Sequence, residues 1–66
     1  MSIRLNGENA DTRGAATIAE LAANYGLAPH TVLIEHNGVA LHQREWPAQS
    51  VKDGDQIEFV RVVAGG

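Results

Sequence analysis

The sequence predicts an α+β fold in which one helix packs across one face of a mixed β-sheet. Three observations lead to this prediction: two Asn-Gly turns flanked by strand-like segments, one well-capped helical segment, and a final apolar strand. The 66 residues are expected to form a single domain, residues 1–66. A chain of this length buries only about 60% of the surface that its unfolded form exposes. Nearly all of its large apolar side chains are therefore needed in one compact core.

The first segment, Ser2–Asn6, alternates polar and apolar residues with the period of a half-buried strand. Ile3 and Leu5 are expected to face inward. The Asn6-Gly7 pair is a strong hairpin signal, because both central positions of a type I′ turn need a positive φ. The return strand, residues 8–13, is poor in apolar residues, so it should be short and weakly packed.

The helical segment begins at a predicted capping box, in which the Thr17 hydroxyl accepts from the Glu20 amide and the Glu20 side chain reaches back to the Thr17 amide. Gly26 suits the left-handed position that ends a helix, and Pro29 prevents it from resuming. The expected length is about three turns. The residues predicted to form its apolar stripe are Ile18, Leu21, Ala22 and Tyr25.

Residues 31–36 are apolar and β-branched and predict a buried strand. The second Asn-Gly pair, at 37–38, turns the chain into a short strand at 39–41. The polar stretch that follows, residues 42–50, contains Trp46, which is expected to cover the edge of the core in a half-exposed position.

The last strand is expected at residues 56–63, after a tight turn in which Gly54 supplies a positive φ. Ile57 and Phe59 should share its inward face. The first and last strands both carry inward apolar pairs, so the last strand should lie beside the first in the middle of the sheet. This order of elements, with one helix on one face of the sheet, is the β-grasp arrangement.

Composition excludes several classes of function. The chain has no cysteine, so it has neither a disulfide nor a thiolate nucleophile. A formal net charge of −3 argues against nucleic-acid binding. There is no apolar run long enough for a membrane span and no signal-like start, so a cytoplasmic location is expected.

Two sets of titratable residues receive structural interpretations. No metal site is expected at His30, His36 and His42, because the carboxylate or thiolate ligands that usually accompany histidines in such a site are missing. All three histidines are predicted to lie at the surface or at a strand edge. Asp53 and Asp55 lie on either side of Gly54. They are expected to form local hydrogen bonds that stabilise the turn rather than to act in acid–base catalysis.

The chain ends in Gly65-Gly66, directly after the predicted last strand. By itself this pair could be chance or a frayed end. Glycine has no Cβ, so Ala64 and Gly65 could thread an expected flexible tail, residues 64–66, into a narrow channel of a partner. Three residues beyond residue 63 reach about 10 Å at full extension. The Gly66 carboxylate could then be activated as an acyl-adenylate and converted to a thiocarboxylate, with no catalytic side chain on this chain.

Three features together resemble the thiamine-biosynthesis sulfur carrier (ThiS) proteins of the β-grasp, ubiquitin-like superfamily. They are Asn37-Gly38 followed by Arg44-Glu45-Trp46, the turn at 53–57 with the sequence Asp-Gly-Asp-Gln-Ile, and the Val-Ala-Gly-Gly end at 63–66. The resemblance covers the whole chain and is sharpest from Asn37 onward. Leu41-His42 departs from the apolar residue and proline that family members often have after the Asn-Gly turn.

The resemblance implies a route for sulfur. An E1-like adenylyltransferase of the ThiF type uses ATP to adenylate Gly66, and a sulfur donor protein supplies the sulfur of the thiocarboxylate. A thiazole synthase of the ThiG type then accepts the sulfur for the thiazole ring of thiamine. The chain itself is expected to be a monomer, to bind no cofactor and not to be an enzyme.

A partner-docking patch is a further hypothesis. Val60 and Val62 fall on the strand face opposite Ile57, where they are either ordinary exposed valines or, with Leu33, a docking surface for the adenylating enzyme. Arg61 is expected in solvent at the end of the sheet, where it could pair with an acidic group of a partner.

Three alternatives remain open on the sequence alone. A sulfur carrier for molybdopterin synthesis would share the fold and the tail. A β-grasp interaction module would bind partners through its sheet and be indifferent to the tail. A small hydrolytic enzyme has least in its favour, because neither a cleft nor a nucleophile–base pair can be recognised in the sequence.

Overall fold

The computed structural model of the protein describes residues 1–62. The strands, the α-helix and two short 3₁₀-helices follow in the order β1 (Ser2–Leu5), β2 (Glu8–Asp11), α1 (Ile18–Asn24), η1 (Pro29–Thr31), β3 (Val32–His36), β4 (Val39–Leu41), η2 (Gln43–Ala48) and β5 (Gln56–Arg61). The strands form one five-stranded sheet in the order β2-β1-β5-β3-β4. This is the predicted α+β arrangement, with a mixed sheet and one α-helix.

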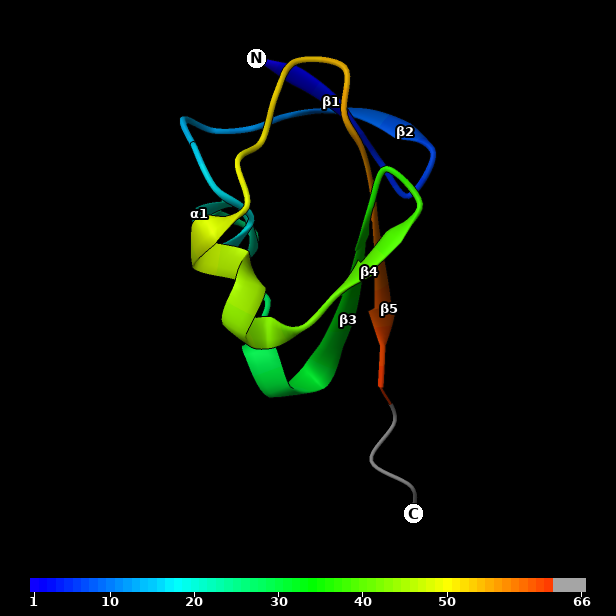
Figure 1. The fold of residues 1–66 in the computed structure, drawn as a ribbon. Coiled ribbons are helices and arrows are strands. Elements are labelled where there is room, and N and C mark those ends of the chain that lie inside the picture. The colour runs from blue at the N-terminus through cyan, green and yellow to red at the C-terminus, as the bar shows by residue number, and fades with distance from the viewer. Residues whose placement is uncertain (63–66) are drawn as a thin grey trace.

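Strand β5 lies in the centre of the sheet (Figure 1). It pairs in parallel with β1, where Leu5 lies opposite Ile57, and antiparallel with β3, where Ile34 lies opposite Phe59. The prediction that the last strand lies beside the first, in the middle of the sheet, is confirmed. The last strand joins the N-terminal hairpin to the β3–β4 hairpin, so neither hairpin has to be stable alone.

The core lies between the sheet and the segments on one of its faces, helix α1 and the chain that includes η2 (Figure 1). Its central residues come from different elements: Ile3 from β1, Ile18 and Leu21 from α1, Ile34 from β3 and Ile57 from β5, all at most 1% exposed. Burying a side chain of this size contributes about 1.5–3 kcal/mol to folding. The other buried apolar residues are Ala15, Ala22, Val32, Leu41, Trp46 and Val51.

Both Asn-Gly pairs form the turns that the sequence predicts. Asn6 and Gly7 have φ values of 51° and 82°, and Asn37 and Gly38 have values of 52° and 86°. Strand β2 is short, as expected, and lies at the sheet edge, although it ends at Asp11 rather than at residue 13. Strand β3 alternates buried and exposed residues, so the prediction of a wholly buried strand is wrong.

Helix α1 is shorter than predicted, and its N-terminal cap differs in one bond. Its seven residues make two turns rather than three. The Thr17 hydroxyl accepts from the Glu20 amide at 3.2 Å, as predicted, but Glu20 Oε1 accepts from the amide of Ala16 at 2.7 Å rather than from that of Thr17. Glu20 therefore provides a hydrogen-bond acceptor for the backbone amide one residue before the N-cap.

The C-terminus of α1 is a Schellman motif centred on Gly26, which has a φ of 69°. The Leu27 amide donates to Ala22 O at 2.9 Å, and the Gly26 amide donates to Ala23 O at 3.1 Å. Gly26 therefore ends the helix as predicted. Pro29 then begins the 3₁₀-helix η1, which leads into β3.

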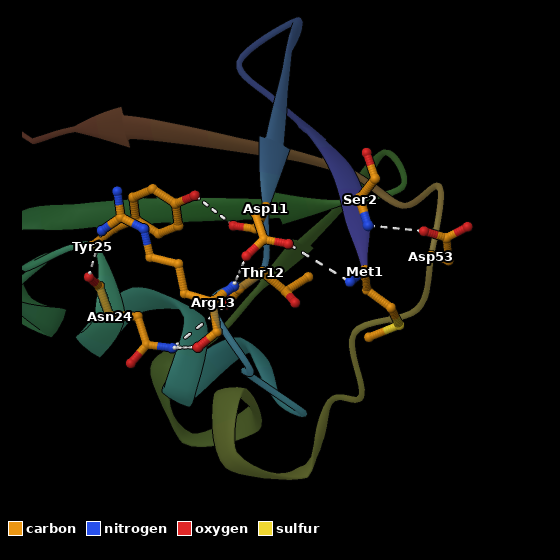
Figure 2. Close-up of polar contacts among 8 residues, drawn as sticks. All are labelled: Met1, Ser2, Asp11, Thr12, Arg13, Asn24, Tyr25 and Asp53. Atoms are coloured by element: carbon orange, nitrogen blue, oxygen red, sulfur yellow. Dashed lines mark hydrogen bonds and ion pairs between the residues drawn. The ribbon is translucent and has the colours of Figure 1, made fainter.

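The loop between β2 and α1 is attached to the end of the helix by polar contacts (Figure 2). Tyr25 Oη donates to the carbonyl of Asp11 at 2.6 Å, and the Arg13 guanidinium carbon lies 4.2 Å from the centre of the Tyr25 ring. Asn24 Nδ2 donates to the carbonyl of Arg13 at 3.1 Å. These contacts hold the β2–α1 loop against the C-terminal end of α1.

Trp46 is buried, with 3% of its surface exposed, so the prediction of a half-exposed lid is wrong. The segment expected to be an irregular polar stretch forms η2, which carries the indole into the core. Its Nε1 atom is buried and has no hydrogen-bond partner among residues 1–62. An unpaired buried N–H is costly, so packing of the indole outweighs this cost.

His36 is also buried, at 8% exposure, so its predicted surface or edge position is wrong. Its Nε2 atom lies 2.7 Å from Oδ2 of Asp55. Asp55 also accepts from the Lys52 amide at 2.8 Å and from Asn37 Nδ2 at 3.2 Å. Asp55 therefore combines the predicted turn chemistry with a link between the β3–β4 turn and the start of β5.

The pKa of Asp55 is lowered below its ordinary value of 3.8. Burial by itself raises the pKa, but hydrogen bonds from His36, the Lys52 amide and Asn37, together with the charge interaction with His36, favour the carboxylate more strongly. A lowered folded-state pKa stabilises the protein above the unfolded-state value, and this contribution is lost as the pH falls through the folded-state value.

We predict that Asp55→Asn lowers the free energy of unfolding by about 1–3 kcal/mol near neutral pH, because a buried charge-assisted network loses its acceptor. The difference from wild type should shrink as the pH falls below 3.8. Urea unfolding at stepped pH values measures both effects. Asp53→Asn is the matched control, since Asp53 is exposed and, within residues 1–62, its carboxylate accepts only from the Ser2 amide. Equal losses in both variants, or a difference that does not change with pH, would contradict this account.

Candidate functional site

The residues on which the expected tail chemistry depends, Ala64, Gly65 and Gly66, lie outside the described residues 1–62. The structure does describe the strand that leads to them. Strand β5 runs through the centre of the sheet, and its C-terminal end lies away from the N-terminus (Figure 1). The described part of the candidate site is therefore its root, the end of β5.

The root is fixed by hydrogen bonds from both sides. The Phe59 amide donates to Asn6 Oδ1 at 2.8 Å, which attaches β5 to the first hairpin. The Val62 amide donates to the carbonyl of Thr31 at 2.9 Å. This hydrogen bond continues the pairing between β5 and the β3 segment by one residue beyond the end of β5 at Arg61. The chain therefore leaves the sheet from a defined position at Val62.

Three apolar side chains are exposed close to this root. Leu33, Val60 and Val62 are 59%, 52% and 48% exposed, and we call these three residues the apolar patch. Leu33 lies directly opposite Val60 in the pairing of β3 with β5, so their side chains share the open face of the sheet. Leu33 and Val60 are therefore neighbours in the folded sheet.

Arg61 is exposed, as predicted, but it belongs to the other face of the sheet. It lies opposite the buried Val32, whereas its neighbour Val60 lies opposite the exposed Leu33. Alternation along a strand therefore separates Arg61 from the apolar patch. A partner contact through Arg61 would have to approach from the side of the helix.

A hollow of about 290 Å³ adjoins the patch at the root of the tail. The side chains that line it are Pro29, His30, Val32, Leu33, Leu41, His42, Gln43, Trp46 and Val62. It lies where η1, η2 and the end of β5 meet. The sequence does not predict this hollow, because its local pattern indicates neither the 3₁₀-helix η2 nor a buried Trp46.

The histidines do not converge. His36 is buried against Asp55, whereas His30 and His42 are exposed near the hollow, where His30 Nδ1 lies 3.5 Å from Gln43 Nε2. Within residues 1–62, no group of three or more His, Cys, Asp or Glu side chains is placed to hold a metal ion. The same part of the chain contains no helix long and apolar enough to span a membrane.

The buried His36–Asp55 pair has the geometry of two members of a catalytic triad, but its surroundings give it a structural role. Among residues 1–62, no Ser or Thr hydroxyl is hydrogen-bonded to His36. The other partners of Asp55 are the Lys52 amide and the Asn37 side chain, both part of the turns. The pair holds β5 in register with β3.

Comparison with known proteins gives consistent results. The sequence profile of the ThiS family matches residues 3–66. The crystal structure of the thiamine biosynthesis protein (ThiS) from Geobacter metallireducens is 33% identical, with a TM-score of 0.83 and full coverage of both chains. The NMR structure of a thiamine biosynthesis protein from the same organism is 33% identical, with a TM-score of 0.78, covering 100% of this chain and 88% of that one.

A third relative is larger. A thiazole synthase from Magnetococcus marinus is 33% identical to this chain over 66 residues. The match covers 100% of this chain but only 20% of that protein. This chain therefore spans about a fifth of the length of that relative.

We predict that Leu33→Ser and Val60→Ser, made singly, change the free energy of unfolding by less than about 1 kcal/mol, because both side chains are largely exposed. Ile34→Ala is the contrast, since Ile34 is fully buried on the same strand and its truncation should cost about 2–5 kcal/mol. Thermal or urea unfolding measures all three. Losses at Leu33 or Val60 as large as that at Ile34 would show that the patch is needed for folding rather than available to a partner.

Proposed function

This chain belongs to the ThiS family, whose members are sulfur carriers in thiamine biosynthesis rather than catalysts, and we propose that it carries sulfur on its own C-terminus. The observation that supports this most directly is that the family match runs from residue 3 to residue 66. It therefore includes the terminal Gly65-Gly66 pair, on which the chemistry depends. The structural similarity over the full length of a ThiS protein supports membership of the same family.

In the proposed reaction, an oxygen of the Gly66 carboxylate attacks the α-phosphorus of ATP and pyrophosphate leaves. The resulting acyl-adenylate is a good electrophile, whereas a free carboxylate is a poor one. A hydrosulfide equivalent from a sulfur donor protein then attacks the carbonyl carbon and AMP leaves, which yields a thiocarboxylate. Ala64 and Gly65 thread the active-site channel of the adenylating enzyme, an E1-like protein of the ThiF type that binds the ATP.

The acceptor of the sulfur is proposed to be a thiazole synthase of the ThiG type. The support is the relative named thiazole synthase, in which a segment similar to the whole of this chain is part of one longer polypeptide. Two proteins that work on the same intermediate gain from being held close together. The same observation favours the thiazole pathway over molybdopterin synthesis.

The apolar patch is proposed as the surface on which the adenylating enzyme docks. Leu33 and Val60 lie on the open face of the sheet, and Val62 lies where the chain leaves it. A partner that covers the patch would hold the strand leading to Gly66 at the mouth of its active site. Arg61 is on the other face and is proposed only as a secondary contact with an acidic group. The cytoplasmic location and the monomeric state remain predictions.

We predict that deletion of Gly66 abolishes both adenylation and thiocarboxylate formation and leaves the free energy of unfolding unchanged. The reacting carboxylate would move one residue back, to a position that no longer reaches the reaction centre. Intact mass spectrometry with the candidate adenylating enzyme, ATP and a sulfur donor measures the modification. In wild type, the adenylated chain should be heavier by one AMP less water. After AMP leaves, the product should differ from the unmodified chain only by the exchange of one oxygen for sulfur, mapped to Gly66.

An Ala64→Gly variant is the control, since it keeps the length and the terminal glycine pair. It should still be modified. An unmodified wild-type chain, tested with an enzyme that is active on another carrier, would overturn the carrier assignment. The alternative function, an interaction module whose binding does not depend on the tail, would then be favoured over the sulfur carrier.

A further inference from the structure

Two glutamates face each other next to the apolar patch. Glu35 on β3 lies directly opposite Glu58 on β5, two residues along each strand from the Leu33–Val60 pair. All four side chains therefore lie on the open face of the sheet, and all four are exposed. Two residues of a strand span about 7 Å. The Glu35–Glu58 pair therefore lies about this distance along the strands from the Leu33–Val60 pair.

Neither glutamate forms an ion pair within residues 1–62. The ion pairs in this part of the chain are those of the N-terminal ammonium with Asp11 and of His36 with Asp55. Arg4 lines a hollow of about 340 Å³ together with Glu58, but its guanidinium donates to Gly7 O and to Asn9 Oδ1 instead. This arginine is thus engaged with the first hairpin.

Like charges directly opposite each other destabilise a sheet. The pairing of β3 with β5 is the longest in this sheet, and it carries this repulsion between Glu35 and Glu58. On the covered face of the same pairing, no two like charges lie opposite each other: the pairs there are Val32–Arg61, Ile34–Phe59 and His36–Ile57. The cost is confined to the face that a partner can reach.

We propose that Glu35 and Glu58, together with the apolar patch, form one docking surface that selects a protein partner with a basic side chain beside an apolar area. This inference rests on the proposed function, and it identifies that partner as the adenylating enzyme. A cation of the partner, in a position to contact both carboxylates, would remove their repulsion on binding. The apolar patch would be buried against the partner, and the two glutamates would fix the orientation in which the partner binds.

A second copy of this chain is a poor occupant of the same surface. A two-fold contact through this face would bring two Glu35–Glu58 pairs together, which places four carboxylates in one interface. The formal net charge of −3 adds to this repulsion. Charge complementarity therefore favours a basic partner over self-association.

The test uses the single variants Glu35→Gln and Glu58→Gln in the full-length chain. Glu8→Gln is the matched control, because Glu8 is exposed on the edge strand β2 and the substitution changes the net charge equally. Affinity for the purified adenylating enzyme is measured by titration at low and high salt, and adenylation at saturating enzyme by mass spectrometry. Unfolding in urea is measured for every variant.

Each docking variant should bind the enzyme about tenfold more weakly at low salt, with a difference that shrinks at high salt. Adenylation at saturation should be unchanged. The same variants should be as stable as wild type or more stable, because a repulsion has been removed. Weaker binding without loss of stability distinguishes a docking role from a structural one.

Binding of Glu35→Gln and Glu58→Gln equal to that of wild type, or a loss shared by Glu8→Gln, would overturn the inference and leave the carrier function intact. A chain that binds the enzyme through these glutamates but is never adenylated would overturn the carrier function instead. Absence of any binding between wild type and the enzyme would overturn both.

Discussion

Strand β5 has to satisfy two neighbours at once, and the rest of the structure depends on this constraint. Its backbone pairs in parallel with β1 and antiparallel with β3, and its inward residue Ile57 is fully buried in the core. Without β5, the molecule would be two isolated hairpins, neither of which has enough apolar surface to be stable. The last segment of the chain is therefore the one that completes the core.

This constraint has a functional consequence. In the proposed function the reacting group follows the last strand, so its position benefits from the pairing of that strand on both sides. Hydrogen bonds from the Phe59 amide to Asn6 and from the Val62 amide to Thr31 fix β5 to both halves of the domain up to its end. The proposed partner enzymes can then position the terminus by binding the domain, which supplies orientation without ordering a long linker.

The two faces of the sheet differ in their surroundings: one is covered by the core and the other is open. One face packs against α1 and η2 and holds the core, including the buried Trp46. The open face carries the apolar patch and the Glu35–Glu58 pair, features that cost stability or contribute nothing to it. The proposed docking role accounts for these residues, since a sheet that served folding alone would gain from polar or oppositely charged pairs there.

Local signals in the sequence determined the two Asn-Gly turns, the Thr17 cap, the helix end at Gly26 and the alternation of the first strand, and these predicted the β-grasp arrangement. They could be read from the sequence because each depends on residues within about four positions of one another. Only the tertiary structure decided the burial of Trp46, the His36–Asp55 link and the Glu35–Glu58 pair. Those depend on strand register and on packing between distant segments, which no local pattern encodes.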